Sequence, residues 1–261
     1  MPDYNTSINV LGSISDINVI IETIKYFQKT QDIEAARKEF VEGNAFGFNI
    51  SSSRKRFFSL IKKLFLTEAD EPDRQFFLQA LASDRPNSSH KKSILYLEVF
   101  RKNELFKDIT EKLIYLKYQD NMRLVSSREI ADFLRKIEEG TKIAEWSDST
   151  VKTVASKYIG FMKRLGYFEP ENRYKSMIAY PYPTKELLTY IVYLLKVAGK
   201  NDHEIYESAL YSALMLEEGE KVELLKQGSL AGYYKFNFTG QRSASFELNY
   251  ESEEIIDAIF S

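Results

Sequence analysis

The 261-residue chain contains no cysteine and only two histidines, His90 and His203. Without cysteine it can form neither a disulfide nor a thiolate metal site. The two histidines are far apart in the sequence, and each lies among polar residues typical of an exposed helix start, so they do not predict a transition-metal site. We therefore expect no bound metal ion.

Long hydrophobic runs are also missing. The longest, 187–195, already contains Thr189 and is too short to span a bilayer. The first residues have neither the basic region nor the apolar core of a signal peptide. Because 44% of the residues are hydrophobic and 14% are aromatic, the chain still has ample material for two or three folded cores. We expect a cytoplasmic, soluble protein without a membrane partner.

Motifs of common catalytic sites are absent as well. Gly199-Lys200 lacks the preceding glycine and the following Ser or Thr of a phosphate-binding loop, and the chain has no glycine-rich dinucleotide motif. It has no Gly-x-Ser-x-Gly turn for a nucleophilic serine. No acidic residue is followed two positions later by lysine, the pattern of many metal-dependent nucleases. We expect a protein that is not an enzyme, with no catalytic residues and no cofactor.

The charge of −2 says little by itself, but its distribution is uneven. Residues 200–261 hold twelve acidic and five basic residues, a net charge of −7, so the remainder carries +5. Two stretches, 51–65 and 149–164, contain several Lys or Arg and no acidic residue. Local basic faces of this kind, more than the global charge, determine attraction to a polyanion.

The most informative stretch is 149–165. Apolar residues at helical spacing form one stripe of it: Val151, Val154, Ala155, Tyr158, Met162 and Leu165. The opposite stripe has only small, hydroxyl or cationic side chains: Ser149, Lys152, Thr153, Ser156, Gly160 and Lys163. Such a helix can pack on one side and approach a phosphate backbone with the other.

Capping signals predict where this helix and its neighbour begin and end. Ser126 and Ser127 are candidate N-caps of a preceding short helix. Ser147 or Asp148 can cap the basic helix. Gly166 suits its C-terminal end, where a left-handed residue stops a helix. Two helices joined by a turn are therefore expected.

A hairpin is predicted directly after these helices. An extended segment begins at 167–168, a turn follows at 170–173, and a second strand runs over 174–180. This order indicates a winged helix-turn-helix, with Arg173 and Lys175 on the wing. The alternative is that the basic residues form only a solvated helix face: Lys152, Lys157, Lys163 and Arg164.

The N-terminal part, 8–66, predicts a second unit resembling a helix-turn-helix. Its last helix, 54–66, packs apolar residues inward and is again the most basic element of its unit. The residues that make it a candidate for binding are Arg54, Lys55, Lys62 and Lys63. A three-helix cap with a soluble outer face explains the same pattern equally well.

The remaining segments complete the expected organisation. Helices are predicted over 91–106, 109–118, 185–198 and 202–216, a flexible break at 228–232, a hairpin around a turn at 239–242, and a closing helix at 253–260. The aromatic residues of this hairpin could stack bases, but we favour a core-facing role for them. The predicted fold is mainly α, with a helix-turn-helix-like N-terminal domain (1–85), a helical segment plus winged helix (86–198), and a small acidic α+β part with a β-hairpin (199–261).

Several of these segments together resemble the BrxA family. They are the block from Ser51 to Phe57, the helical middle ending in Tyr115-Leu116, the block from Ser147 through Phe168, and the closing hairpin with its helix. BrxA is a small component of bacterial BREX phage-exclusion systems. The resemblance implies a mostly helical, non-enzymatic protein that binds double-stranded DNA and acts with other BREX components. It carries over no residue-level active site.

The leading hypothesis is therefore an antiviral defence factor that binds double-stranded DNA, mainly through backbone phosphates. The candidate faces offer Lys, Ser and Thr, which hold phosphates, and they lack the Asn, Gln and Arg combinations typical of base-edge reading. The candidate DNA-binding residues are Arg54, Lys55, Lys62, Lys63, Ser149, Lys152, Thr153, Ser156, Lys163, Arg164, Arg173 and Lys175. Two alternatives remain: a protein-interaction scaffold whose acidic C-terminal part docks a partner, and an RNA-binding helical protein.

Overall fold

The computed structural model describes residues 4–179, 182–240 and 243–261, and the chain forms two compact units. The first comprises Met1–Thr67 and Tyr96–Pro181, and the second comprises Glu68–Leu95 and Tyr182–Ser261. Each unit is thus built from two separated segments, whereas the sequence suggested three consecutive domains. The second unit joins its segments through packing such as the stacked rings of Phe76 and Tyr190, 5.3 Å apart, a contact that no local pattern indicates.

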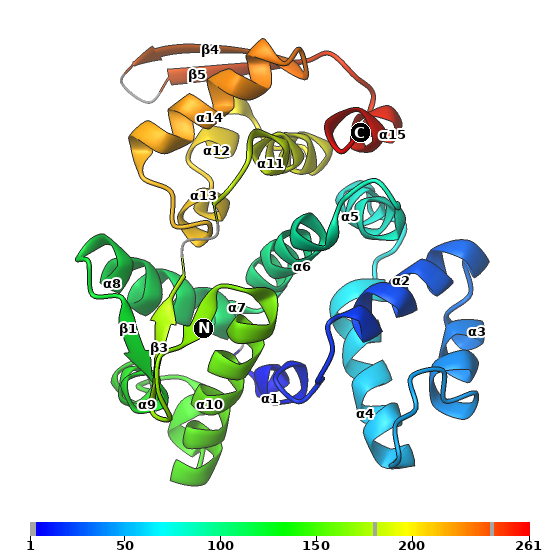
Figure 1. The fold of residues 1–261 in the computed structure, drawn as a ribbon, viewed down its shortest axis with the longest axis vertical. Helices are drawn as coiled ribbons and strands as arrows, with labels where there is room; N and C mark the ends of the chain where they lie inside the picture. The colour runs from blue at the N-terminus through cyan, green and yellow to red at the C-terminus, as the bar shows by residue number, and fades with distance from the viewer. Residues whose placement is uncertain (1–3, 180–181, 241–242) are drawn as a thin grey trace. The chain divides into compact units, whose positions relative to one another are not determined.

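The N-terminal part of the first unit is helical (Figure 1). Its elements are α1 (Ser7–Leu11), α2 (Asn18–Thr30), α3 (Ile33–Arg37), the π-helical turn η1 (Lys38–Glu42), α4 (Ser51–Ile61) and the π-helical turn η2 (Lys62–Leu66). Asp32 caps α3 by accepting hydrogen bonds from the backbone N–H groups of Glu34 and Ala35. The predicted helix over 54–66 corresponds to α4 and η2.

The middle of the chain breaks more often than its sequence pattern predicts. The helices are α6 (Ser88–Lys102), α7 (Glu104–Ile109), the π-helical turn η3 (Thr110–Tyr115) and α8 (Leu116–Gln119). The predicted helix over 91–106 ends early because buried Asn103 caps α7, its side chain accepting a hydrogen bond from the Phe106 N–H at 2.8 Å. A capping side chain within the predicted helix therefore divides it into two.

Two helices and a small sheet follow, which we name the α9–β3 module (124–178). Its elements are β1 (Leu124–Ser126), α9 (Ser127–Lys136), the 3₁₀ turn η4 (Lys142–Glu145), α10 (Asp148–Leu165), β2 (Phe168–Pro170) and β3 (Lys175–Ile178). The sheet is antiparallel with the order β1-β3-β2. The predicted strand over 174–180 corresponds to β3, although Tyr180 lies outside the described residues.

The second unit combines helices with a hairpin. Besides the first residues of α6, its elements are α5 (Pro72–Ala82), α11 (Lys185–Val197), α12 (Asp202–Tyr206), α13 (Ala209–Ala213), α14 (Glu218–Leu230), β4 (Tyr234–Gly240), β5 (Ser243–Leu248) and α15 (Ser252–Ile259). The predicted helix over 202–216 is two helices, because the Ser208 side chain caps α13. The mainly α fold with a small β part is confirmed.

The predicted flexible break at 228–232 is wrong at its start. Helix α14 continues to Leu230, and Gly228 is buried within it. A Cβ atom on Gly228 would lie 2.5 Å from the Tyr234 hydroxyl and 2.9 Å from the Thr189 hydroxyl. The glycine therefore serves close packing and not helix termination.

The aromatic face of the β4–β5 hairpin packs inward, as we favoured. Phe236 and Phe246 lie 5.1 Å apart, and Phe238 stacks on Tyr206 of α12 at 5.3 Å. These rings pack against each other and against the helices beneath them. The predicted turn at 239–242 falls partly on residues 241–242, which lie outside the described residues.

Candidate nucleic-acid interface

Helix α10 has the two faces that its sequence predicts. The Ser147 side chain caps its first turn, and Gly166 ends it in the left-handed conformation with φ of 89°. Every residue of the predicted apolar stripe is buried, together with Ile159 and Phe161. The Tyr158 hydroxyl lies 2.9 Å from the Thr110 hydroxyl, so this face is tied to the helical middle of the unit.

The opposite face of α10 is open. Ser149, Lys152, Thr153 and Ser156 are exposed, and Lys163 is half-exposed. The Thr153 hydroxyl donates to the Ser149 carbonyl at 2.7 Å and so keeps only its acceptor capacity for a ligand. No acidic residue lies between Ser149 and Leu165, and Asp148, the first residue of the helix, pairs with Arg135 of α9.

Helix α9 is held in a fixed position against α10. Ser126 and Glu129 form a reciprocal capping box at its start. At its other end the Arg135 guanidinium donates to Asp148 at 2.6 Å and to the Trp146 carbonyl at 3.1 Å. Arg135 therefore connects the last turn of α9 to the first turn of α10.

The loop between β2 and β3 is ordered by one side chain. The Asn172 Oδ1 atom accepts hydrogen bonds from the backbone N–H groups of Tyr174 and Lys175, both at 2.9 Å. This local bonding shapes a tight turn. It leaves Arg173, Tyr174 and Lys175 exposed, with the Arg173 guanidinium 5.7 Å from the ring of Tyr174.

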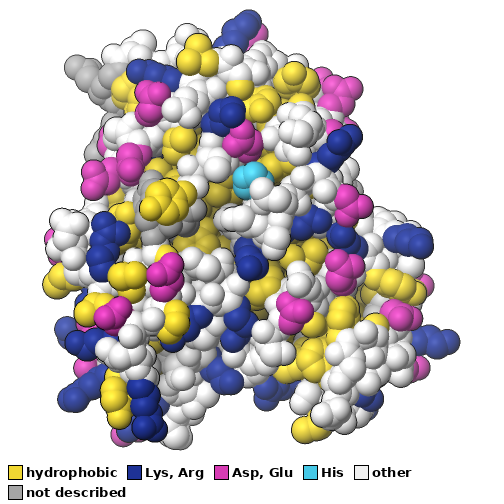
Figure 2. Space-filling model, in the orientation of Figure 1, with side chains coloured by type: hydrophobic (Ala, Val, Ile, Leu, Met, Phe, Trp, Pro, Cys, Tyr) yellow, Lys and Arg dark blue, Asp and Glu magenta, His cyan; other side chains and the backbone are white. Residues whose placement is uncertain are grey.

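A cavity of about 250 Å³ lies where the helix face meets this loop. It is lined by Ser127, Ser156, Ile159, Gly160, Lys163, Asn172, Arg173, Tyr174, Lys175 and Ser176. The lining includes three cations and no acidic residue, and among the described residues Lys163, Arg173 and Lys175 form no ion pair. Lys and Arg side chains are also visible over α9 and α10 in Figure 2. We call this site the basic cavity.

The structure gives the predicted residues different positions. It brings Ser156, Lys163, Arg173 and Lys175 together in the basic cavity. Farther toward the start of α10, an exposed extension of the same stripe follows: Ser149, Lys152 and Thr153. Ser127, Asn172 and Tyr174 also line the cavity, although their sequence pattern did not mark them as binding residues.

Arg164 is not among the residues that line the basic cavity. Its guanidinium is half-buried and donates to the carbonyl oxygen of Leu11, the last residue of α1, at 3.4 Å. Burial lowers the pKa of this guanidinium below its ordinary value. Arg164 thus fastens α1 to α10.

The basic residues of α4 and η2 form a separate group. Lys55 and Lys63 are exposed and Lys62 is half-exposed. The Arg54 guanidinium donates to the Phe48 carbonyl at 2.7 Å and so holds the loop that precedes α4. Of the four predicted residues, the three lysines offer their charge to solvent.

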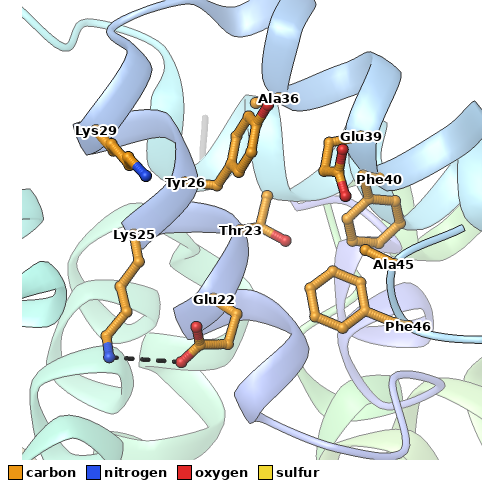
Figure 3. Close-up of a pocket in the computed structure, with 10 residues that line it drawn as sticks. All are labelled: Glu22, Thr23, Lys25, Tyr26, Lys29, Ala36, Glu39, Phe40, Ala45 and Phe46. Atoms are coloured by element: carbon orange, nitrogen blue, oxygen red, sulfur yellow. Dashed lines mark ion pairs between the residues drawn. The ribbon is translucent and has the colours of Figure 1, made fainter. Parts of the chain in front are cut away.

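A second cavity, of about 360 Å³, lies between α2, η1 and the loop before α4. Its wall is aromatic, with Phe40 and Phe46 5.3 Å apart (Figure 3). Its rim carries both signs of charge, including the ion pair of Lys25 with Glu22 at 3.6 Å. Acidic and basic residues balance in this lining, whereas the charged residues in the lining of the basic cavity are all cations.

Two absences in the described residues concern other kinds of site. No group of three or more His, Cys, Asp or Glu side chains within them could hold a metal ion. Within the same residues, no helix is both long and apolar enough to cross a membrane.

The fold and the basic cavity define a helical protein that carries a pair of helices followed by a small antiparallel sheet with a cationic surface. The family model of BrxA matches residues 4–193. The chain therefore belongs to the BrxA family, which makes it a component of a BREX system. The match covers the α9–β3 module and ends within α11, so α12 to α15 and the hairpin lie beyond it. No curated protein and no solved structure matches the chain.

Proposed function

We propose that this protein is a non-enzymatic double-stranded DNA-binding component of a BREX anti-phage system. In this proposal the α9–β3 module acts as a winged helix that holds DNA mainly by its phosphates. The basic cavity is the observation that supports it. Helix α10 and the β2–β3 loop contribute cations to one concave site without any carboxylate, which is the composition that a phosphodiester requires.

The dimensions and chemistry of the module suit duplex DNA. An α-helix fits the major groove of B-form DNA, and the small residues Ser149, Ser156 and Gly160 let α10 approach closely. Arg173 and Lys175 on the loop would then reach phosphates beside the groove. Because the exposed stripe offers Lys, Ser and Thr, binding should depend weakly on base sequence.

The two alternatives are less well supported. A-form RNA has a deep, narrow major groove that does not admit a helix, so the exposed face of α10 favours DNA. A protein partner would favour an apolar centre surrounded by polar groups, whereas the centre of this surface is cationic. The proposal places DNA binding in the first unit and does not use the second unit. Contacts with other BREX components are therefore compatible with it.

The experiment that tests the proposal is a mobility-shift titration of a duplex at several salt concentrations. Replacing Lys152→Gln and Lys163→Gln together should weaken binding and lower the slope of log affinity against log salt by roughly 2. The matched control replaces Lys226→Gln and Lys235→Gln, which removes the same charge from exposed positions of the second unit. Equal affinity and slope for the wild type and the first variant, both folded by circular dichroism, would refute the proposal.

The absence of catalysis is part of the same proposal. It rests on the missing phosphate loop, dinucleotide motif and acid-x-Lys pattern in the sequence. Plasmid DNA incubated with the protein and Mg²⁺ or Mn²⁺ should remain intact. Cleavage that co-purifies with the protein and is abolished by replacing one of its acidic residues would contradict it.

A further inference from the structure

Helix α1 packs against two other helices of the first unit, α10 and α4 (Figure 1). These two helices share a feature: the stretches 51–66 and 149–165 carry several cations and no acidic residue. Asp148, the one acidic residue of α10, pairs with Arg135 of α9. Helix α1 therefore lies between the two cationic helices of the unit. Its own segment, from Tyr4 to Ser15, also contains no acidic residue.

Gly12 fixes the distance between α1 and α10. A Cβ atom at this position would lie 2.4 Å from the carbonyl oxygen of Lys157 and 2.5 Å from its Cβ atom. The φ angle of Gly12 is −70°, which every residue adopts, so space and not backbone conformation requires glycine here. The backbones of α1 and α10 touch at a point where no other residue fits without movement.

Further contacts hold the same segment in place. Arg164 of α10 donates to the Leu11 carbonyl at 3.4 Å. The Tyr4 hydroxyl donates to Asp108 of α7, which also pairs with Lys112 at 2.8 Å. Ile8, Leu11 and Ile14 are fully buried. Because α1 is fixed by so many contacts, it can hold α4 in a defined position relative to α10.

Helical spacing shows where α1 lies relative to the exposed stripe. Lys157 and Arg164, which contact α1, fall on one border of that stripe, and Ile159, which lines the basic cavity, falls on the other. The loop with Arg173 and the α1 side thus flank the stripe on opposite borders. Because α4 packs against α1, it lies beyond the border that α1 contacts.

We infer that α1 joins α4 and α10 into one surface that holds a single DNA duplex at two places, with Gly12 as the positioning residue. The inference rests on the proposed function. Two interhelical spacings of about 8–10 Å each put α4 roughly 20 Å from α10, less than the ~34 Å of one DNA helical turn. Phosphates of the same duplex are therefore within reach of both helices.

The first test is a double-mutant cycle in the full chain, using a duplex of about three helical turns. Replacing Lys55→Gln and Lys63→Gln on α4 and η2 should weaken binding on the order of thirtyfold at 0.15 M salt and lower the salt slope by roughly 2. In the background of Gly12→Ala, the same pair of changes should cost less than about threefold, because the two surfaces no longer act as linked sites. The control for the glycine is Gly219→Ala in α14, where nothing lies near an added Cβ atom.

A second test does not depend on the folding of Gly12→Ala. The chain has no cysteine, so Ser59→Cys on α4 and Ser156→Cys on α10, both at exposed positions, can each carry a DNA-cleaving iron chelate. We expect both to cut one bound duplex, at a constant offset from each other when the duplex has a defined end or a preferred site.

The outcomes separate the inference from the proposed function. If Ser156→Cys cuts and Ser59→Cys does not, or if neither the α4 changes nor Gly12→Ala alters binding while the Lys152 and Lys163 changes do, the inference fails and the proposed function stands. If no cationic variant alters binding and neither cysteine variant cuts, the proposed function fails as well.

Discussion

The sharpest consequence of the basic cavity concerns its three cations, Lys163, Arg173 and Lys175. Their replacement by glutamine removes three positive charges from one site and leaves the fold intact. Arg173 and Lys175 are exposed, Lys163 is half-exposed, and none of them forms an ion pair with another described residue. Substitutions of this kind change stability by about 0.5 kcal/mol or less.

The magnitude follows from the release of counterions. Each phosphate contact contributes about 0.9 to the slope of log affinity against log salt, so losing three should lower that slope by about 2.7. Between 50 and 200 mM salt, the affinity gap between wild type and the triple variant should then shrink by about fortyfold. A simple loss of folded protein would lower affinity equally at every salt concentration.

The assay is fluorescence anisotropy of a labelled duplex over this salt range, with thermal unfolding measured in parallel. The control triple variant replaces Lys200→Gln, Lys226→Gln and Lys235→Gln, which makes the same charge change on the second unit. The reasoning is refuted if the cavity variant keeps the wild-type slope, or if the control lowers it as much. The first result would show that the cavity does not contact phosphates, and the second that only total charge matters.

Three further predictions concern stability. Gly228→Ala should lower the free energy of unfolding by about 1–3 kcal/mol, because its Cβ atom would meet the Tyr234 hydroxyl; chemical denaturation measures this, and an unchanged midpoint would contradict it. Ser126→Ala should cost about 1 kcal/mol in the same assay through loss of the capping box of α9, whereas Ser252→Ala, whose side chain is not the cap of α15, should cost less. Burial lowers the pKa of His90, so the folded state binds fewer protons there than the unfolded state. The free energy of unfolding should therefore fall as the pH drops below about 6.5 and stay level above it. In thermal unfolding, His90→Gln should flatten this pH dependence.

Much of the local structure was predictable because helix signals are local. The spacing of apolar residues, Ser147 at the start and Gly166 at the end define α10 without knowledge of any partner. The β4–β5 hairpin follows in the same way from alternating aromatic residues. Strand β1 was not predicted, because it has three residues and exists only through its pairing with β3, in which Leu124 lies opposite Met177. No local pattern specifies such a partner.

The division into two units was equally beyond local pattern. Helices α5 and α11 belong to one unit because their apolar faces pack together, although the whole α9–β3 module separates them in the chain. A sequence read in order favours consecutive domains. Only the packing of distant apolar faces shows which segments share a core.

The sequence by itself determined which helix faces are apolar and where cations stand without acidic neighbours, because both are properties of residue type and helical period. The tertiary structure decided which of those cations meet. In the folded protein Lys163 lies beside Arg173 and Lys175. Arg54 and Arg164 instead donate hydrogen bonds to the carbonyl groups of Phe48 and Leu11. A long cationic side chain bonds whichever acceptor the packed backbone places within its reach, and that placement is fixed only when the helices have packed.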